Sequence, residues 1–77
     1  MNRYCITTYL VWRTIAPDQQ LRVRAATSHS ARTAAARHWG LRSDNGLTSM
    51  VQPGTRCQEV QANKMPAAFV LAGKEKA

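Results

Sequence analysis

Hydrophobic and polar residues alternate along the first part of the chain, from Arg3 to Thr14, in a stretch rich in Tyr, Ile, Thr, Val and Trp. Alternation among β-branched and aromatic residues predicts a strand that turns one face toward a core. The even positions, from Tyr4 to Trp12, are more apolar than the odd ones, so we assign the even positions to the core. The odd positions, which include Arg3, Tyr9 and Arg13, would then face away from it.

A turn and a second alternating strand follow. Residues 16–20 contain a proline and an aspartate, which favour a turn because proline presets one dihedral and aspartate bonds to the nearby backbone. From Leu21 to Ala26, one face carries Leu21, Val23 and Ala25, and the other carries Arg22, Arg24 and Ala26. Because the connection is short, the two strands would form an antiparallel hairpin.

The centre of the chain has the period and composition of a helix. Thr27 and Ser28 offer an N-terminal cap, with Ser30 as a second candidate. From His29 to Trp39 the segment is rich in alanine, the best helix former, and Gly40 suits the left-handed position after the helix end. The stripe expected to face the sheet consists of Ala31, Ala34, Ala35 and His38. The sheet face expected beneath it holds Ile6, Leu10, Leu21 and Val23.

The last third of the chain predicts a second hairpin. Leu47 to Gln52 and Arg56 to Gln61 have the composition of strands, and Pro53-Gly54 between them is typical of a type II turn. Residues 62–66 would be a linker, residues 67–71 a short fifth strand or an extended tail, and residues 73–77 a frayed end. The order β-β-α-β-β predicts an α+β fold, with one helix packed on one face of an antiparallel sheet, as a single domain over residues 1–72.

The chain is strongly basic, which bears on its function. Of its 77 residues, 11 are Lys or Arg and four are Asp or Glu, which gives a net charge of +7. Eight of the basic residues are arginine, whose planar guanidinium suits phosphate and carboxylate groups. This balance predicts an anionic partner, either nucleic acid or an acidic protein surface. The alternative is that the charge serves solubility and reflects a coding bias toward Arg and Ala.

The length of the chain and its apolar pattern bear on its stability and on its location in the cell. A chain this short buries only about 60% of its unfolded surface, so dimerisation or docking on a larger partner would help its thin core. No apolar run approaches the ~18 residues that cross a bilayer, and the N-terminus lacks the basic start and apolar stretch of a signal peptide. We therefore expect no membrane contact and a cytoplasmic location in a bacterial host cell.

No group of residues has the pattern of a catalytic or metal site. The four acids are scattered, and no pair is arranged for general acid and base work. Cys5 and Cys57 with His29 and His38 lack the close spacing of a zinc site, and no orienting third group accompanies them as a nucleophile and base. We expect a protein without enzymatic activity, metal or cofactor. The two cysteines are expected to be reduced, with a bridge between them as the alternative.

The candidate binding surface follows from the assignment of strand faces. If the even positions of the first strand face the helix, the outer face gathers Arg3, Tyr9, Arg13, Arg22 and Arg24. Like charges across a sheet destabilise it unless water screens them or an anion binds there. The guanidinium groups would contact phosphates beside a stacking Tyr9, or the same face would dock onto an acidic protein surface. A solvated face of extended arginines is the third interpretation.

Four stretches of the chain follow one another in an order of strands and helix that other small proteins share. They are Tyr4 to Leu10, Leu21 to Ala26, Thr27-Ser28 with Ala31, Ala34 and Ala35, and Leu47 to Val60. This layout resembles small phage-encoded anti-CRISPR proteins that inhibit type I surveillance complexes, in length and order of elements and in no specific motif. Many such inhibitors are acidic and mimic DNA, whereas this chain is basic. The resemblance therefore implies contact with an acidic patch on a Cas subunit, or with nucleic acid directly.

Two functions are expected from these observations. The first is a phage or mobile-element accessory protein that binds a host defence complex and inhibits it sterically, as the resemblance implies. The second is a small nucleic-acid-binding module that uses the arginine-rich sheet face.

Overall fold

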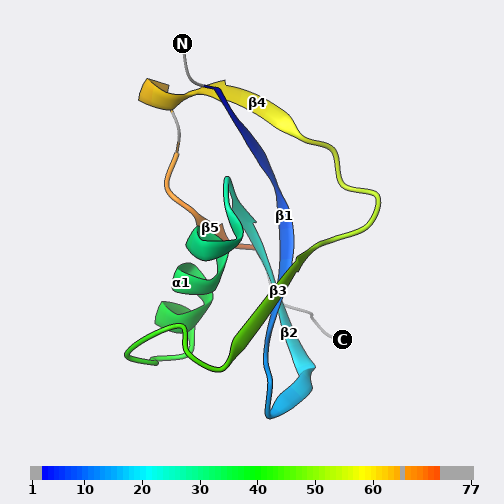
Figure 1. Ribbon diagram of the computed structural model, residues 1–77, viewed down its shortest axis with the longest axis vertical. Helices are drawn as coiled ribbons and strands as arrows, with labels where there is room; N and C mark the ends of the chain where they lie inside the picture. The colour runs from blue at the N-terminus through cyan, green and yellow to red at the C-terminus, as the bar shows by residue number, and fades with distance from the viewer. Residues whose placement is uncertain (1–2, 65, 72–77) are drawn as a thin grey trace.

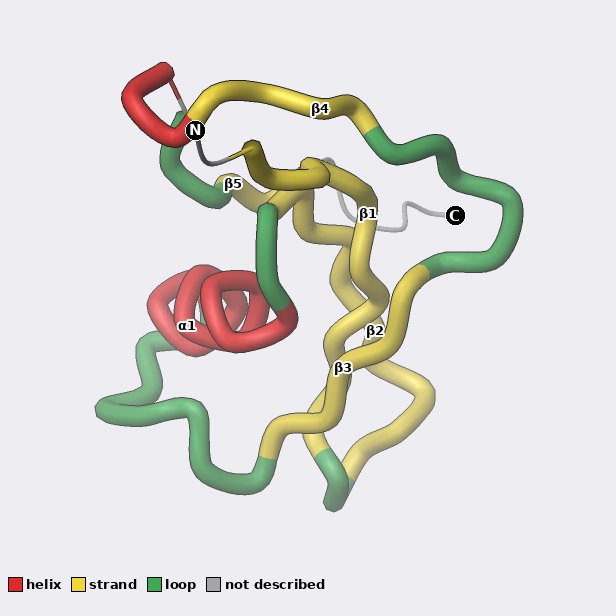
Figure 2. Tube along the Cα trace, turned by 45° about the horizontal axis from the view of Figure 1, so that its top comes forward, coloured by secondary structure: helices red, strands yellow, loops and turns green. Residues whose placement is uncertain are grey.

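β1 (Arg3–Arg13) runs through the centre of the sheet, and the other strands are arranged around it (Figure 1). The computed structural model describes residues 3–64 and 66–71. The remaining elements are β2 (Ala16–Ala25), α1 (Ser28–His38), β3 (Leu47–Val51), β4 (Gln58–Gln61), a 3₁₀ turn (Ala62–Lys64) and β5 (Phe69–Val70). Every strand pair is antiparallel and α1 lies on one side of the sheet, which confirms the predicted α+β fold (Figure 2). Residues 73–77, the predicted frayed end, lie outside the described residues.

Two strands share one edge of β1. β3 pairs with the second half of β1 and β4 pairs with its first half, while β2 occupies the opposite edge and carries β5. After β3, the amide of Gln52 still donates to the carbonyl of Thr8 at 2.9 Å, and the chain then leaves the edge before pairing again at Gln58. The predicted second hairpin is therefore wrong. Gly54 does form a turn, with φ of 86°, but the chain continues along β1 instead of folding back on β3.

The connection between β1 and β2 is shorter than the sequence suggests. Residues 14–15 make the turn, because strand pairing resumes at Ala16. The register then shifts, since residues 17–19 bulge out of β2 before the pair of Trp12 with Gln20. The proline and aspartate that favour a turn therefore lie in a bulge inside the strand.

This register decides which side of β1 is buried. Val11 pairs with Leu21, and Tyr9 pairs with Val23. Residues directly opposite each other project from the same face of a sheet, so the odd positions of β1 share the side of the apolar residues of β2. The assignment of the even positions to the core is wrong for Leu10 and Trp12, whereas Ile6 is buried. The physical reason is that a shift of one residue in register exchanges the two faces of a strand.

The hydrophobic core lies between the sheet and α1. Val11 and Val23 are completely buried at its centre, and so are Ala31 and Ala35 on the facing side of the helix. The small alanine side chains allow α1 to lie close to the sheet. The buried cluster consists of Val11, Leu21, Val23, Ala25, Ala31 and Ala35. The expected contribution of Leu21 and Val23 is therefore confirmed. Leu10 and Ile6 lie outside this cluster, although Ile6 is buried.

α1 begins and ends close to the predicted residues. The side-chain oxygen of Thr27 accepts a hydrogen bond from the amide of Ser30 at 3.0 Å, which satisfies one unpaired donor of the first turn. Gly40 has φ of 73°, the left-handed conformation that ends many helices. His38 is exposed, so its expected place in the buried stripe is wrong, and Ala36 is buried in addition. Within the described part of the chain, no helix is long and apolar enough to cross a membrane.

A disulfide joins Cys5 of β1 to Cys57, immediately before β4. The two Cα atoms are 5.2 Å apart, within the usual range for a bridge. The expectation of reduced cysteines is therefore wrong, and the alternative of a bridge between them is confirmed. The pairing of β4 with β1 brings the two residues to neighbouring strands, which their spacing in the sequence does not reveal. The exposed ion pair of Arg3 with Glu59, at 3.4 Å, adds little to this attachment.

We predict that replacing both Cys5 and Cys57 by serine lowers the free energy of unfolding. The bridged residues are separated by 52 positions, and closing a loop of this length in the unfolded chain corresponds to roughly 4 kcal/mol at 25 °C. Urea unfolding of the oxidised protein and of the double variant measures the difference. Reductant should lower the wild-type midpoint and leave the variant unchanged. Equal wild-type midpoints with and without reductant would contradict a stabilising role for the bridge.

Candidate functional site

The five side chains that the sequence assigns to one binding face are divided between the two sides of the sheet. Arg22 and Arg24 point away from α1, as predicted, because Val23 between them is buried against the helix. Tyr9 lies opposite Val23 and packs on the core from the α1 side. The predicted outward-facing ring of Tyr9 is therefore wrong.

Arg3 and Arg13 lie at the two ends of β1, on the same side of the strand as Tyr9. Arg3 forms its ion pair with Glu59 of β4. Arg13 is partly buried and lines a hollow beside the loop that follows α1. Ten residues of extended strand span about 33 Å, so the two side chains belong to separate surroundings. The predicted single cluster with Arg22 and Arg24 does not form.

The side of the sheet opposite α1 forms the open face, which no helix or strand of the described residues covers (Figure 2). Cross-strand pairs identify its members: Leu10 lies between Arg22 and Met50, and Arg24 lies opposite Phe69. The open face consists of Thr8, Leu10 and Trp12 of β1, Gln20, Arg22 and Arg24 of β2, Thr48 and Met50 of β3, and Phe69 of β5.

Four large apolar side chains of the open face remain partly in water. Met50 is 45% exposed and Phe69 is 48% exposed, while Leu10 and Trp12 are half-buried. A sheet face that meets only solvent usually carries polar side chains at such positions. Removing apolar surface from water is favourable, by about 25 cal/mol for each Å² before the costs of association are subtracted. The open face is therefore an apolar surface with two arginines, suited to contact with another molecule.

Arg24 is held in place across β1. Its Nη2 donates to Oε1 of Gln58 in β4 at 3.1 Å, and its Nη1 lies 3.5 Å from Oγ1 of Thr8. Thr8, which lies opposite Arg24 in the sheet, is only 6% exposed. A side chain fixed in this way loses less rotamer freedom when a ligand binds. Arg24 is therefore already held in position before a ligand arrives.

A hollow of about 230 Å³ opens on the same side of the sheet. It is lined by Leu10, Asp18, Gln20 and Arg22. One wall is apolar, and the others present a carboxylate, an amide and a guanidinium. Such a hollow has room for one side chain of a partner and offers both donors and acceptors to it. Asp18, which the sequence places in a turn, reaches this position because β2 bulges at residues 17–19.

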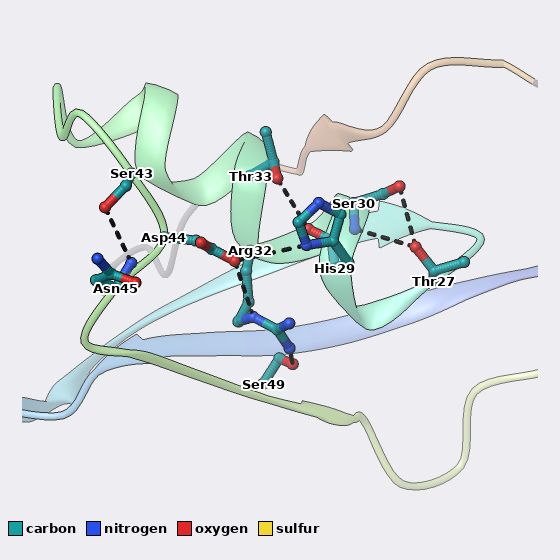
Figure 3. Close-up of polar contacts among 9 residues, drawn as sticks. All are labelled: Thr27, His29, Ser30, Arg32, Thr33, Ser43, Asp44, Asn45 and Ser49. Atoms are coloured by element: carbon teal, nitrogen blue, oxygen red, sulfur yellow. Dashed lines mark hydrogen bonds and ion pairs between the residues drawn. The ribbon is translucent and has the colours of Figure 1, made fainter.

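On the α1 side, a polar network fastens the loop after the helix to the sheet (Figure 3). Nε of Arg32 donates to Oδ2 of Asp44 at 3.3 Å, and its Nη1 donates to Oγ of Ser49 in β3 at 3.0 Å. Nδ1 of His29 lies 3.6 Å from the same carboxylate oxygen. These contacts link three segments and have a structural role. Residues 3–64 and 66–71 contain no group of three or more His, Cys, Asp or Glu residues placed to hold a metal ion.

Sequence reasoning missed Leu10, Trp12, Met50 and Phe69 as surface residues. The signal that could have found them is the hairpin register, because Arg22 and Arg24 cannot share the buried face with Val23. A simple two-residue turn at residues 14–15 would place Leu10 opposite Gln19, but the bulge at residues 17–19 shifts the pairing by three residues and places Leu10 opposite Arg22.

No protein-family model, no curated protein and no solved structure matches this chain.

We predict that two neighbouring residues of β1 differ sharply in their contribution to stability. Val11→Ala should lower the free energy of unfolding by about 2 kcal/mol, because the removed methyl groups leave a cavity in a closed core. Leu10→Ala, which removes more atoms from the open face, should cost less than about 1 kcal/mol. Chemical denaturation of both variants measures the contrast. A larger cost for Leu10→Ala would contradict the register.

Proposed function

We propose that this protein is a small, non-enzymatic binding protein that docks its open face onto a partner protein and blocks that partner sterically. In its specific form, the proposal is a phage or mobile-element accessory protein that inhibits a host defence complex, in the manner of the anti-CRISPR proteins that its layout resembles. The observation that supports docking is the chemistry of the open face, where half-exposed aromatic and aliphatic side chains surround two arginines.

The open face has the composition of the centre of a protein interface. Such centres are enriched in Trp, Phe, Met and Arg and depleted in Lys, Asp and Glu. The nine residues of the open face include Trp12, Met50, Phe69 and two arginines, and none of them is a lysine or an acid. Trp and Arg also dominate the binding energy of many interfaces. Trp12 and Arg24 are therefore the first candidates for energetically dominant contacts.

The matching partner surface would be apolar at its centre and acidic at its rim. Arg22 and Arg24 are neighbours on one face of β2, so the open face carries a concentrated positive charge. The net charge of +7 adds a long-range attraction toward an acidic surface. Attraction of this kind raises the association rate and weakens with added salt. An acidic patch on a protein subunit that itself handles nucleic acid would satisfy these requirements.

A second candidate function is the binding of single-stranded nucleic acid. The observation that favours it is the presence of two aromatic rings, Trp12 and Phe69, on the same face as Arg22 and Arg24. Bases stack on aromatic side chains of a sheet while guanidinium groups contact the phosphates. This candidate replaces the predicted role of Tyr9, whose ring packs on the core.

Two matched pairs of variants test the first proposal. Arg22→Glu with Arg24→Glu reverses two charges on the open face, and Arg37→Glu with Arg56→Glu reverses two exposed charges elsewhere. In bacteria with an active type I CRISPR system, the wild-type protein should restore plaque formation by a targeted phage. The first pair should lose this effect because it removes the basic contacts, and the second pair should keep it. The melting temperatures of all variants provide the control for folding.

Titration with nucleic acid separates the two candidates. Phosphate-driven binding to duplex weakens with salt at a logarithmic slope near −0.9 for each neutralised phosphate. Binding of a single strand at about 50 mM salt, abolished by Trp12→Ala, would favour the nucleic-acid module. No plaque rescue, together with no specific bacterial protein retained on the immobilised wild type, would contradict the inhibitor proposal.

A further inference from the structure

A second hollow lies where the turn between β1 and β2 meets the loop that follows α1. The amide of Thr14 donates to the carbonyl of Gly46 at 2.8 Å, which holds the turn against the loop. The hollow has a volume of about 250 Å³ and shares no lining residue with the hollow on the open face. Its lining residues include Arg13 at the end of β1 and Ile15 in the turn, together with Leu41, Arg42 and Leu47 from the loop and the start of β3.

Two arginines, Arg13 and Arg42, line this second hollow. Within the described ranges, neither Arg13 nor Arg42 forms an ion pair or a side-chain hydrogen bond. Arg13 is partly buried, so water alone hydrates its charge incompletely. Two like charges on one hollow also repel each other, and a bound anion would relieve both costs.

The acid of the adjoining loop is held elsewhere. Oδ2 of Asp44 lies 3.3 Å from Nε of Arg32 and 3.6 Å from Nδ1 of His29, both on α1 (Figure 3). Only 27% of the Asp44 side chain is exposed. The carboxylate of Asp44 is therefore paired with α1, and Asp44 is not among the residues that line the hollow. The loop presents positive charge to the hollow while its negative charge faces α1.

Apolar side chains adjoin the two cations. Ile15 is 84% exposed at the tip of the turn, and Leu41 and Leu47 are half-buried. A single exposed isoleucine is ordinary on a protein surface. Here Ile15 lies beside Arg13 and Arg42, so it can make a non-polar contact with the organic part of a bound anion. The second hollow thus combines a doubly basic wall with an apolar one.

We infer that this second hollow binds a phosphate monoester whose organic part is apolar, such as an aryl phosphate. A phosphate monoester carries a charge of about −1.5 to −2 at neutral pH, which matches two guanidinium groups. Each guanidinium can donate two parallel N–H bonds to phosphate oxygens. A carboxylate carries one charge and leaves one arginine uncompensated. This site goes beyond the proposed function, because it lies apart from the open face.

The experiment uses the full-length protein and three ligands at fixed ionic strength. Phenyl phosphate, inorganic phosphate and benzoate are titrated while amide and arginine Nε signals are followed by NMR. Phenyl phosphate should bind most tightly, since it alone uses both walls, and benzoate should bind most weakly. The signals that move should be those of Arg13, Arg42 and residues 43–47. Equal affinity for phenyl phosphate and benzoate would overturn the assignment to a phosphate.

Three pairs of variants with the same change in net charge locate the site. Arg13→Gln with Arg42→Gln should weaken phenyl phosphate binding at least about tenfold, because it removes the charge-assisted hydrogen bonds. Arg22→Gln with Arg24→Gln and Arg37→Gln with Arg56→Gln should each change it by less than about twofold, since screening limits distant charges. Equal losses in all three pairs would show that binding follows net charge and would overturn the inference.

Arg42→Gln alone, at an exposed position, gives the same test if the double variant unfolds. A result here is independent of plaque rescue, which depends on Arg22 and Arg24.

Discussion

The register between β1 and β2 is the constraint on which the rest of the structure depends. With Val11 opposite Leu21 and Tyr9 opposite Val23, the apolar residues of both strands meet α1 on one side. The same register turns Leu10 and Trp12 outward to join Arg22 and Arg24. Core and open face are therefore two results of one alignment, and a slip by one residue would exchange them. The alanine face of α1 fits this arrangement because small side chains let the helix lie close above Val11 and Val23.

Local chemistry made the elements predictable, whereas long-range pairing did not. The caps at Thr27 and Gly40 and the alanines between them specify α1 through neighbouring residues alone, and the strands are evident from their composition. The outward face of β1 is not evident, because both of its residue sets contain large apolar side chains. The even positions were assigned to the core because they are more apolar, but the bulge at residues 17–19 sets a register that turns Tyr9 and Val11 toward α1. The pairing of β4 with β1, and the disulfide that accompanies it, join segments more than 50 residues apart. Arg22 and Arg24 could therefore be predicted as surface residues from their charge. The apolar residues of the open face could not, because their exposure depends on the strand register.

The distribution of acids explains why a strongly basic chain has localised basic surfaces. Asp44 is taken up by Arg32 on α1, and Glu59 by Arg3 at the edge of β4. Each of these acids already lies beside an arginine of another segment, although the exposed Arg3–Glu59 pair adds little to stability. The open face and the hollow between Arg13 and Arg42 keep their positive charge as a consequence. Asp18 alone, among the acids of the described residues, lies beside the open face, where it lines the hollow with Arg22.

Methyl contacts in solution test the register most directly. In a nuclear Overhauser spectrum of methyl-labelled protein, the methyl groups of Ala31 and Ala35 should show cross-peaks to those of Val11 and Val23, because these side chains form one buried cluster. The methyl groups of Leu10 should show none to α1, because they lie on the opposite side of the sheet. Cross-peaks between Leu10 and Ala35, with Val11 accessible to water, would contradict the register and the open face that follows from it.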